Sequence, residues 1–303
     1  MPGPFDEGWA DRRRRRFVVA SAAMVREARR ATGLVRLRPP TRVPQSGLAE
    51  LLRSRDVVMV LASRDIKLRY RQAAFGVGWV VLGPLLGAGV FAIVFGGVAD
   101  LSSEGVSYFA FALAGMTAWN LVSGTVLRAT QSLVQNPAMV SRVYVPRLAL
   151  PVSAMMASVV DLLVSCGLLA VVCAVEGIAP GPAILLAPVW LVLLLSLAGG
   201  VGLVLAAALV RYRDIATVVT LAVQLVLFAS PVAYSAAAVP PRFDLLYTLN
   251  PLVGLLEGFR WSTLGTPAPS AGRLLAGIGV ALVSPVIGLL WFAKREPDFA
   301  DLI

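Results

Sequence analysis

Long apolar runs constrain the fold of this chain more than any other feature of its sequence. Six stretches of about 20 residues or more carry almost no charge, and about 20 apolar residues are what a helix needs to cross roughly 30 Å of hydrocarbon. The 303 residues are 58% hydrophobic, above the roughly 45–50% of an ordinary soluble domain. We therefore predict an all-α integral membrane protein with six transmembrane helices, at about residues 75–98, 106–127, 150–175, 183–210, 215–236 and 271–293.

The distribution of charge predicts how these helices are oriented. Residues 1–72 hold 17 Lys and Arg against 7 Asp and Glu, a net charge of +10, and the rest of the chain holds 10 of each. The later Lys and Arg residues gather in connections on the same side of the membrane as this basic segment. The positive-inside rule places that side, and both ends of the chain, in the cytoplasm. Because the basic segment adjoins the first apolar run, we expect it to contact membrane lipids and no nucleic acid.

Three segments lie outside the predicted spans. Residues 1–46 are rich in Arg, Ala and Pro and are predicted to form a basic, partly disordered cytoplasmic tail. Residues 48–72 place apolar positions at helical spacing among basic ones, which predicts an amphipathic helix in the membrane interface. Residues 237–270 are too apolar for a plain loop and are broken by prolines, which predicts short re-entrant helices that dip into the outer leaflet. Glu257 and Arg260, at i,i+3 spacing, can pair on one of these helices.

The types of residue present exclude most enzymatic chemistry. Histidine is absent, which removes the commonest general base and metal ligand. Cys166 and Cys173 would lie about 10.5 Å apart along a helix, too far for a disulfide, and they lack partners for a metal site. A phosphate-binding loop needs a lysine directly after a glycine, but Lys67 and Lys294 follow isoleucine and alanine. We predict no catalytic residue, metal site or cofactor on this chain, so any ATP-driven work needs a second polypeptide.

Asp161 is the one acidic residue near the middle of a clean apolar span. Ionisable groups inside a membrane are expensive and are often functional. Two interpretations stay open. Asp161 is either a structural acid that hydrogen-bonds to Ser153, Ser158 or Ser165, or a contact for a polar substrate or another subunit.

Aromatic side chains form a second candidate set. Most of them lie near the outer ends of the predicted spans, where belts of aromatic residues meet the membrane interface. The alternative is a passage lined with flat apolar rings, along which sugars can slide. Trp119 lies further inward and fits a belt less well. The candidates for channel lining are Phe91, Phe95, Phe109, Trp119, Phe228 and Tyr234.

Several motifs, in order along residues 50–293, resemble those of polysaccharide-exporting ABC permeases. They are the segment Ser63–Gln72 with Gly76-Val-Gly-Trp79 and Pro84-Leu85, the run Asn136–Arg147, the run Arg211–Ile215, Ser230-Pro231, and Asn250-Pro251 with Arg260. Single motifs are weak, but the ordered set is specific. The chain is similar to ABC-2-type permeases of the O-antigen, teichoic-acid and galactan exporters.

That resemblance implies a permease domain over residues 47–303. Such permeases form homodimers and join two copies of a separate ABC ATPase, which holds the ATP and Mg. They move a polyprenyl-diphosphate-linked polysaccharide out of the cytoplasm, across the bacterial plasma (inner) membrane. The resemblance also implies a coupling region at about residues 131–147 and an outer gate at about residues 237–270.

The resemblance and the charge pattern together suggest roles for particular residues. Arg64, Lys67, Arg69 and Arg71 either attract the lipid diphosphate at its entrance or contact ordinary anionic lipids. Arg128, Arg142 and Arg147 either meet carboxylates of the ATPase or only set the topology. The residues expected to couple to the ATPase are Asn136, Pro137, Arg142, Tyr144, Pro146, Arg147, Arg211 and Asp214, and those expected at the outer gate are Asn250, Glu257 and Arg260.

Three other functions compete with glycan export. The first is an ABC-2 exporter of a small lipid or drug. The second is an ion-coupled secondary transporter, which should show several intramembrane acids or broken helices in both halves, whereas only Asp161 qualifies. The third is a membrane-embedded glycosyl or acyl transferase, which the absence of histidine disfavours.

Overall fold

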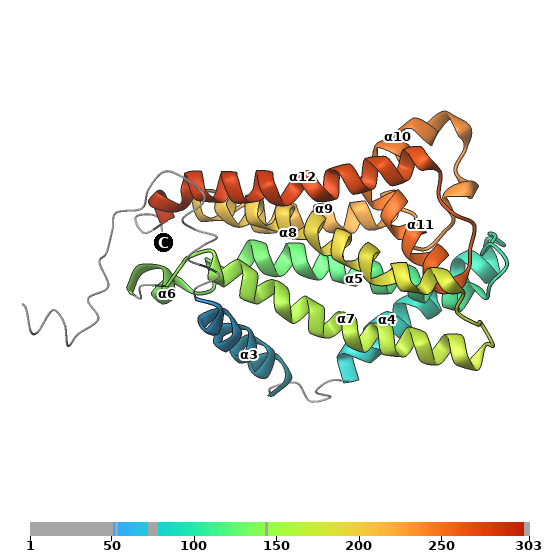
Figure 1. Cartoon of the computed structure of the whole chain (residues 1–303), viewed down its shortest axis with the longest axis horizontal. Coiled ribbons are helices and arrows are strands. Elements are labelled where there is room, and N and C mark those ends of the chain that lie inside the picture. The colour runs from blue at the N-terminus through green and yellow to red at the C-terminus, as the bar shows by residue number, and fades with distance from the viewer. Residues whose placement is uncertain (1–50, 52–53, 72–77, 143–144, 300–303) are drawn as a thin grey trace, which may run out of the picture. The chain divides into compact units, whose positions relative to one another are not determined.

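The computed structural model describes residues 51, 54–71, 78–142 and 145–299. All secondary structure in the described part is helical (Figure 1). The predicted cytoplasmic tail, residues 1–46, lies outside the described residues. So do Tyr144 and parts of the predicted interface segment.

Five helical segments in the described part are long and apolar enough to cross a membrane. They match five of the six predicted spans, because length and hydropathy are properties of the sequence itself. The segments are α4 (Gly78–Phe91) with the π-helical η1 (Ala92–Val98), α5 (Tyr108–Gln131), α7 (Ala149–Val175), η2 (Pro182–Leu186) with α8 (Ala187–Arg211), and α12 (Ala271–Arg295) with η5 (Glu296–Asp298).

The remaining predicted span, residues 215–236, is only partly helical. Helix α9 covers only Ile215–Ala229, about 22 Å at 1.5 Å per residue. It ends at Ser230, whose φ of −111° and ψ of 150° are extended, because a residue that precedes proline is disfavoured in the helical region. The helix therefore ends before Pro231, and the rest of the predicted span is not part of α9.

The remaining helices are short. The predicted gate segment contains two α-helices, of which α11 is largely buried and α10 is exposed. Near the start of the described residues, α3 packs against α7. These short elements are α3 (Arg55–Arg71), α6 (Pro137–Arg142), η3 (Ala236–Ala238), η4 (Pro241–Phe243), α10 (Asp244–Leu249) and α11 (Pro251–Leu264).

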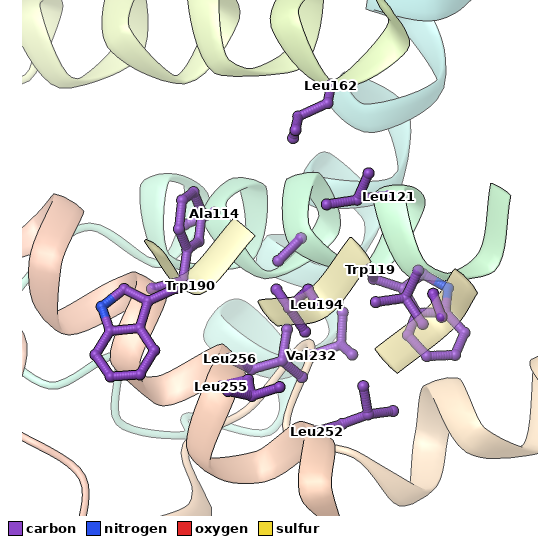
Figure 2. Packing of buried hydrophobic residues seen from close by; sticks show 14 of the residues in the cluster. Ala114, Trp119, Leu121, Leu162, Trp190, Leu194, Val232, Leu252, Leu255 and Leu256 are labelled. Atoms are coloured by element: carbon purple, nitrogen blue, oxygen red, sulfur yellow. The ribbon is translucent and has the colours of Figure 1, made fainter. Parts of the chain in front are cut away.

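Helix α5 is the centre of the bundle. In an apolar stretch of 18 residues within α5, 72% of the residues are buried, against 17–50% in the corresponding stretches of the other four spanning segments. It packs against α4, α7, α8 and α11. Figure 2 shows part of the resulting core, in which residues of α5, α8 and α11 surround Val232.

A second buried cluster lies at the other end of the bundle. It joins α3, α6 and the first turn of α7 to the last turns of α8 and α12, through residues such as Leu61, Leu133, Val140, Val210 and Phe292. We call this end the α6 end and the opposite one the α11 end (Figure 1).

Helices α8 and α12 approach closely because small residues face each other. A Cβ at Gly200 would lie 2.3 Å from the backbone carbon of Ser284. The neighbouring Pro285 has no N–H, which leaves the Ala281 carbonyl of α12 without its helical partner. Ser196 of α8 donates its hydroxyl to that carbonyl at 2.8 Å. One serine thus compensates for the proline inside the helix.

We expect Ser196→Ala to lower the free energy of unfolding by about 0.6 to 1.7 kcal/mol, as for other hydrogen bonds inside membrane helix bundles. Pro285→Ala restores an N–H that can reach the Ala281 carbonyl, so the serine substitution should lose most of its effect in that background. Unfolding in mixed micelles measures both effects. Equal losses in the two backgrounds would show that Ser196 does not compensate for the proline.

Candidate functional site

At the α6 end, Arg64 connects α3 to the predicted coupling region. Its Nη2 donates to the side-chain oxygen of Asn136 at 2.9 Å, and its Nη1 donates to the sulfur of Met139 at 3.4 Å. Asp65 accepts from the same guanidinium at 2.8 Å. Arg64, predicted at a lipid entrance, is therefore bound by protein groups on the segment that leads into α6.

The other predicted coupling residues have separate surroundings. Pro137 is exposed at the start of α6, while Arg142 ends that helix and its side chain lies outside the described residues. Pro146 accepts the Ala149 N–H at 2.8 Å where α7 begins, and Arg147 donates to the Glu296 carbonyl at the end of α12.

Two further coupling candidates lie between α8 and α9. Arg211 is exposed, with its guanidinium carbon 5.6 Å from the ring centroid of Tyr212. Asp214 is also exposed, and its backbone carbonyl accepts the Val218 N–H at 3.1 Å in the first turn of α9. Neither side chain is joined to the Arg64–Asn136 group by a hydrogen bond in the described part of the chain.

The rest of the predicted lipid entrance lies on α3. Lys67 is exposed there. Arg69 and Arg71 fall in the same helix, but their side chains lie outside the described residues.

Asp161 is paired with Arg128, for which the sequence predicts either a contact with the ATPase or a role in topology alone. Arg128 of α5 donates to its carboxylate at 2.5 Å and to the hydroxyl of Ser158 at 2.5 Å. The interpretation of Asp161 as a structural acid agrees with this pairing, since a buried acid needs a partner. Arg128, in turn, reaches inward along α5 toward these two side chains of α7.

At the α11 end, the chain between α9 and η3 is not helical and is held by α11. We call residues 230–235 the break. Asn250 caps α11 by accepting the Leu252 N–H at 3.0 Å, and its amide donates to the Ser230 hydroxyl at 3.1 Å. Proline at position 251 suits the first turn of that helix. The cap of one helix therefore also fixes the end of another.

Arg260 supplies most of the remaining hydrogen bonds to the break. It donates to the carbonyls of Pro231 at 2.7 Å, of Val232, and of Tyr234 at 3.5 Å. Tyr108 donates to the carbonyl of Ala233 at 2.7 Å. All four carbonyls from position 231 to position 234 are thus satisfied, which non-helical backbone requires at membrane depth.

The Arg260 side chain is itself enclosed, with 2% of the residue exposed. Its guanidinium carbon lies 3.8 Å from the ring centroid of Phe111, a cation–π contact. Gly115 of α5 makes room for the group, because a Cβ there would lie 2.0 Å from the Val232 oxygen and 2.3 Å from Nη2 of Arg260. We call Arg260, Gly115, Phe111 and Tyr108 the arginine clamp.

The predicted pairing of Glu257 with Arg260 is wrong. Glu257 instead accepts from Arg273 of α12 at 3.2 Å, and Arg273 also bridges to Asp244 of α10 at 2.7 Å. The i,i+3 pair fails because the arginine is recruited by the carbonyls of the break. Burial raises the pKa of the Glu257 carboxyl, and Arg273 opposes that shift.

The aromatic candidates do not form one lining in this chain. The rings of Phe91 and Phe95 are tilted against each other with their centroids 5.8 Å apart, and Phe91 and Phe109 pack against the core. Trp119 is buried in that core with 5% exposed, so it faces no open passage here (Figure 2).

Two further aromatic candidates lie beside the break. Phe228 is 61% exposed. Tyr234 donates to the Phe228 carbonyl at 2.9 Å and contacts the hydroxyl of Tyr247 in α10.

These features define a multi-pass helical membrane protein. A model of the ABC-2 type transporter family matches residues 56–264, so the chain belongs to that family. An O-antigen export system permease protein, RfbA, of Klebsiella pneumoniae is 25% identical over 254 residues, which cover 82% of this chain and 95% of that protein. A protein of the same name from Myxococcus xanthus is 27% identical over 261 residues, which cover 84% of this chain and 98% of its own.

Sequence reasoning missed three contacts of the site. The Arg128–Asp161 pair could be inferred from the sequence, because opposite charges occur in two consecutive spans. The Arg64–Asn136 bond and the clamp at Gly115 could not be inferred, since each joins segments far apart in sequence.

We expect Gly115→Ala to lower the free energy of unfolding by about 1 to 3 kcal/mol, the range for overpacked sites, because the new methyl group displaces Val232 or Arg260. Gly167→Ala is the matched control, since a Cβ at Gly167 meets no atom within 4 Å. Thermal unfolding in detergent compares the two. A Gly115→Ala protein as stable as Gly167→Ala would contradict the close contact.

Proposed function

We propose that this chain is the permease subunit of an ATP-driven exporter that moves a polyprenyl-diphosphate-linked polysaccharide from the cytoplasmic side across the bacterial plasma membrane. The observation that carries the proposal is the match to O-antigen export permeases over 95–98% of their length. The family model reaches residue 264, within the predicted gate segment. The substrate resembles O-antigen in class, namely a lipid-linked chain of sugars.

The proposed topology has six spans, with α9 as the fifth. This helix is too short to cross alone, but the break continues its path and is sheltered by α11. The α6 end then lies in the cytoplasm together with both chain ends, because Arg142, Arg147, Arg211, Lys294 and Arg295 all lie there. Residues 237–270 form the outer gate, and residues 1–46 form a tail outside the permease domain of residues 47–303.

We further propose a homodimer joined to two copies of a separate ABC ATPase, which holds the ATP and Mg. The exposed face of α9 is the surface that we assign to the second copy. Helix α9 buries only Val219 and exposes Leu221, Leu225 and Phe228 by more than half. A channel for a sugar chain would run between the two copies, with Phe228 and Tyr234 beside it.

We assign the coupling surface to the exposed residues at the start of α6 and just before it. Val134, Gln135, Pro137 and Ala138 are exposed there, while Val140 anchors α6 in the buried cluster. Arg64 belongs to this surface, because its hydrogen bond to Asn136 links α3 to it. Lys67, Arg69 and Arg71 stay candidates for the lipid-diphosphate entrance.

Depletion of the chain in its native cells tests the main proposal. We expect lipid-linked polysaccharide of full length to accumulate in the cytoplasm and to leave it again when the chain is restored. Export should stop when ATP is depleted while the proton gradient is maintained. If a small lipid or drug accumulates instead and the glycans are unchanged, the alternative ABC-2 function replaces this one.

For the coupling surface, we expect Ala138→Glu to reduce co-purification of the ATPase by about tenfold, since a charge buried without a partner at an interface costs more than 1.4 kcal/mol. Asp298→Lys, an exposed charge reversal on η5, is the control and should leave co-purification unchanged. Equal co-purification of the two variants would remove α6 from the interface.

A further inference from the structure

One face of α5 stays half-exposed although the rest of that helix is buried. From Ala110 to Thr130 every position is buried except those on this face. Their spacing of three and four residues places them on a single stripe. The stripe consists of Met116, Asn120, Ser123, Gly124, Leu127, Arg128 and Gln131.

The stripe is polar where lipid would favour an apolar face. Asn120, Ser123, Arg128 and Gln131 are four of its seven members, in a helix whose hydropathy suits a membrane span. Ionisable side chains in such helices almost always face the bundle interior or a water-filled cavity, and neutral polar groups without a hydrogen-bond partner are also unfavourable in hydrocarbon. The stripe therefore points to a polar environment along half of the span.

Asn120 lies on the stripe near the middle of helix α5. Helix α5 runs from Tyr108 to Gln131 over 24 residues, so Asn120 falls at the midplane of a membrane that the helix crosses. Among the residues that the structure describes, none forms a hydrogen bond with its amide. An amide facing hydrocarbon in that state would be unfavourable by several kcal/mol, so we expect its partner to lie outside the part of the chain that the structure describes.

The register of the two neighbouring helices places an open position of α4 at the level of Asn120. Helices α4 and α5 run antiparallel, with Gly96 against Tyr108 and Gly87 against Met116. One turn further, this register brings Gly83 to the level of Asn120. Gly83 is exposed, and a Cβ there would meet no atom within 4 Å.

The charge of the stripe limits what the partner is. Its one cation, Arg128, is paired with Asp161, so the stripe offers little net charge to hold a diphosphate. Asn120 offers a neutral amide. The Ser123 hydroxyl donates to the Trp119 carbonyl at 2.9 Å and keeps its oxygen as an acceptor, and Gln131 continues the polar groups toward the α6 end, where Gln135 donates to it at 2.7 Å. Amide and hydroxyl groups of this kind match the hydroxyl groups of neutral sugars.

We propose that the stripe is a binding track for sugar hydroxyls inside the translocation path, with Asn120 as its contact at the membrane midplane. The proposal rests on the proposed export of a glycan. It adds the place in the chain where the sugars bind, and it assigns the diphosphate to other groups. A second copy of this chain pairing with Asn120 is the rival occupant.

The first test replaces the amide with an apolar group in the full chain, together with its ATPase in native membranes. Asn120→Leu should leave the amount of protein and of bound ATPase unchanged, because leucine is favourable in a membrane helix. Export of the lipid-linked glycan should slow by roughly two- to tenfold, as for one lost hydrogen bond. Thr117→Val is the matched control, since the Thr117 hydroxyl bonds only within α5, at 2.8 Å to Leu113.

The outcomes separate the two proposals. If the wild-type chain exports a glycan and Asn120→Leu exports it equally fast, the track is wrong and the proposed function stands. If the wild-type chain exports no glycan at all, the proposed function itself fails. Slow export by Thr117→Val as well would assign the effect to general damage of α5 and overturn the track.

A labelling experiment distinguishes water, lipid and a second copy at this position. Cys166 and Cys173 are replaced by Ala, and Asn120→Cys is treated with a charged, membrane-impermeant thiosulfonate in inverted vesicles. We expect labelling at least tenfold faster than for Val171→Cys, on a position of α7 that is 59% exposed, because the reagent needs the thiolate in water. Equally slow labelling of both, or an oxidative cross-link between two copies through Asn120→Cys, would contradict the track.

Discussion

The hydrogen bonds of Arg260 to the break are the interaction on which the α11 end depends. A chain in a membrane must satisfy every backbone polar group internally, and the helix before Pro231 cannot continue. The carbonyls of the break that follows are bound by a side chain of α11, ten residues beyond the asparagine that caps the same helix. Two side chains from one short segment thereby fix the non-helical backbone between α9 and η3.

This arrangement explains why α5 is so deeply buried. The guanidinium needs a flat partner on one side and space on the other, and Phe111 and Gly115 of α5 provide them one turn apart. Helix α11 can therefore enter the bundle instead of lying across its end, and it packs on α5, α8 and α12. The core in Figure 2 is a consequence, because Val232 of the break is carried into it.

The sequence predicts the parts of this structure that depend on one segment at a time. The span at 150–175 is observed as Ala149–Val175, because length and hydropathy are local properties, and the stop at Pro231 follows from proline chemistry. Pairings across the bundle do not follow. Glu257 and Arg260 satisfy a helical spacing rule worth only a few tenths of a kcal/mol, and unsatisfied carbonyls outweigh it. Which glycine faces the guanidinium depends on how α5 and α11 are placed, and no local pattern records that.

The two ends of the molecule are joined by the same helices. Helix α5 carries Gly115 of the clamp near one end and Arg128 near the other, and the chain after it leads within a few residues to Asn136. A packed helix transmits displacement because its core contacts cannot stretch. Movement of α6 against a partner would therefore act on α3 through Arg64, and on the break through α5 and Arg260. The polar stripe lies on the α5 face between these two points, so the helix that would transmit the movement also presents the groups proposed to hold the sugars.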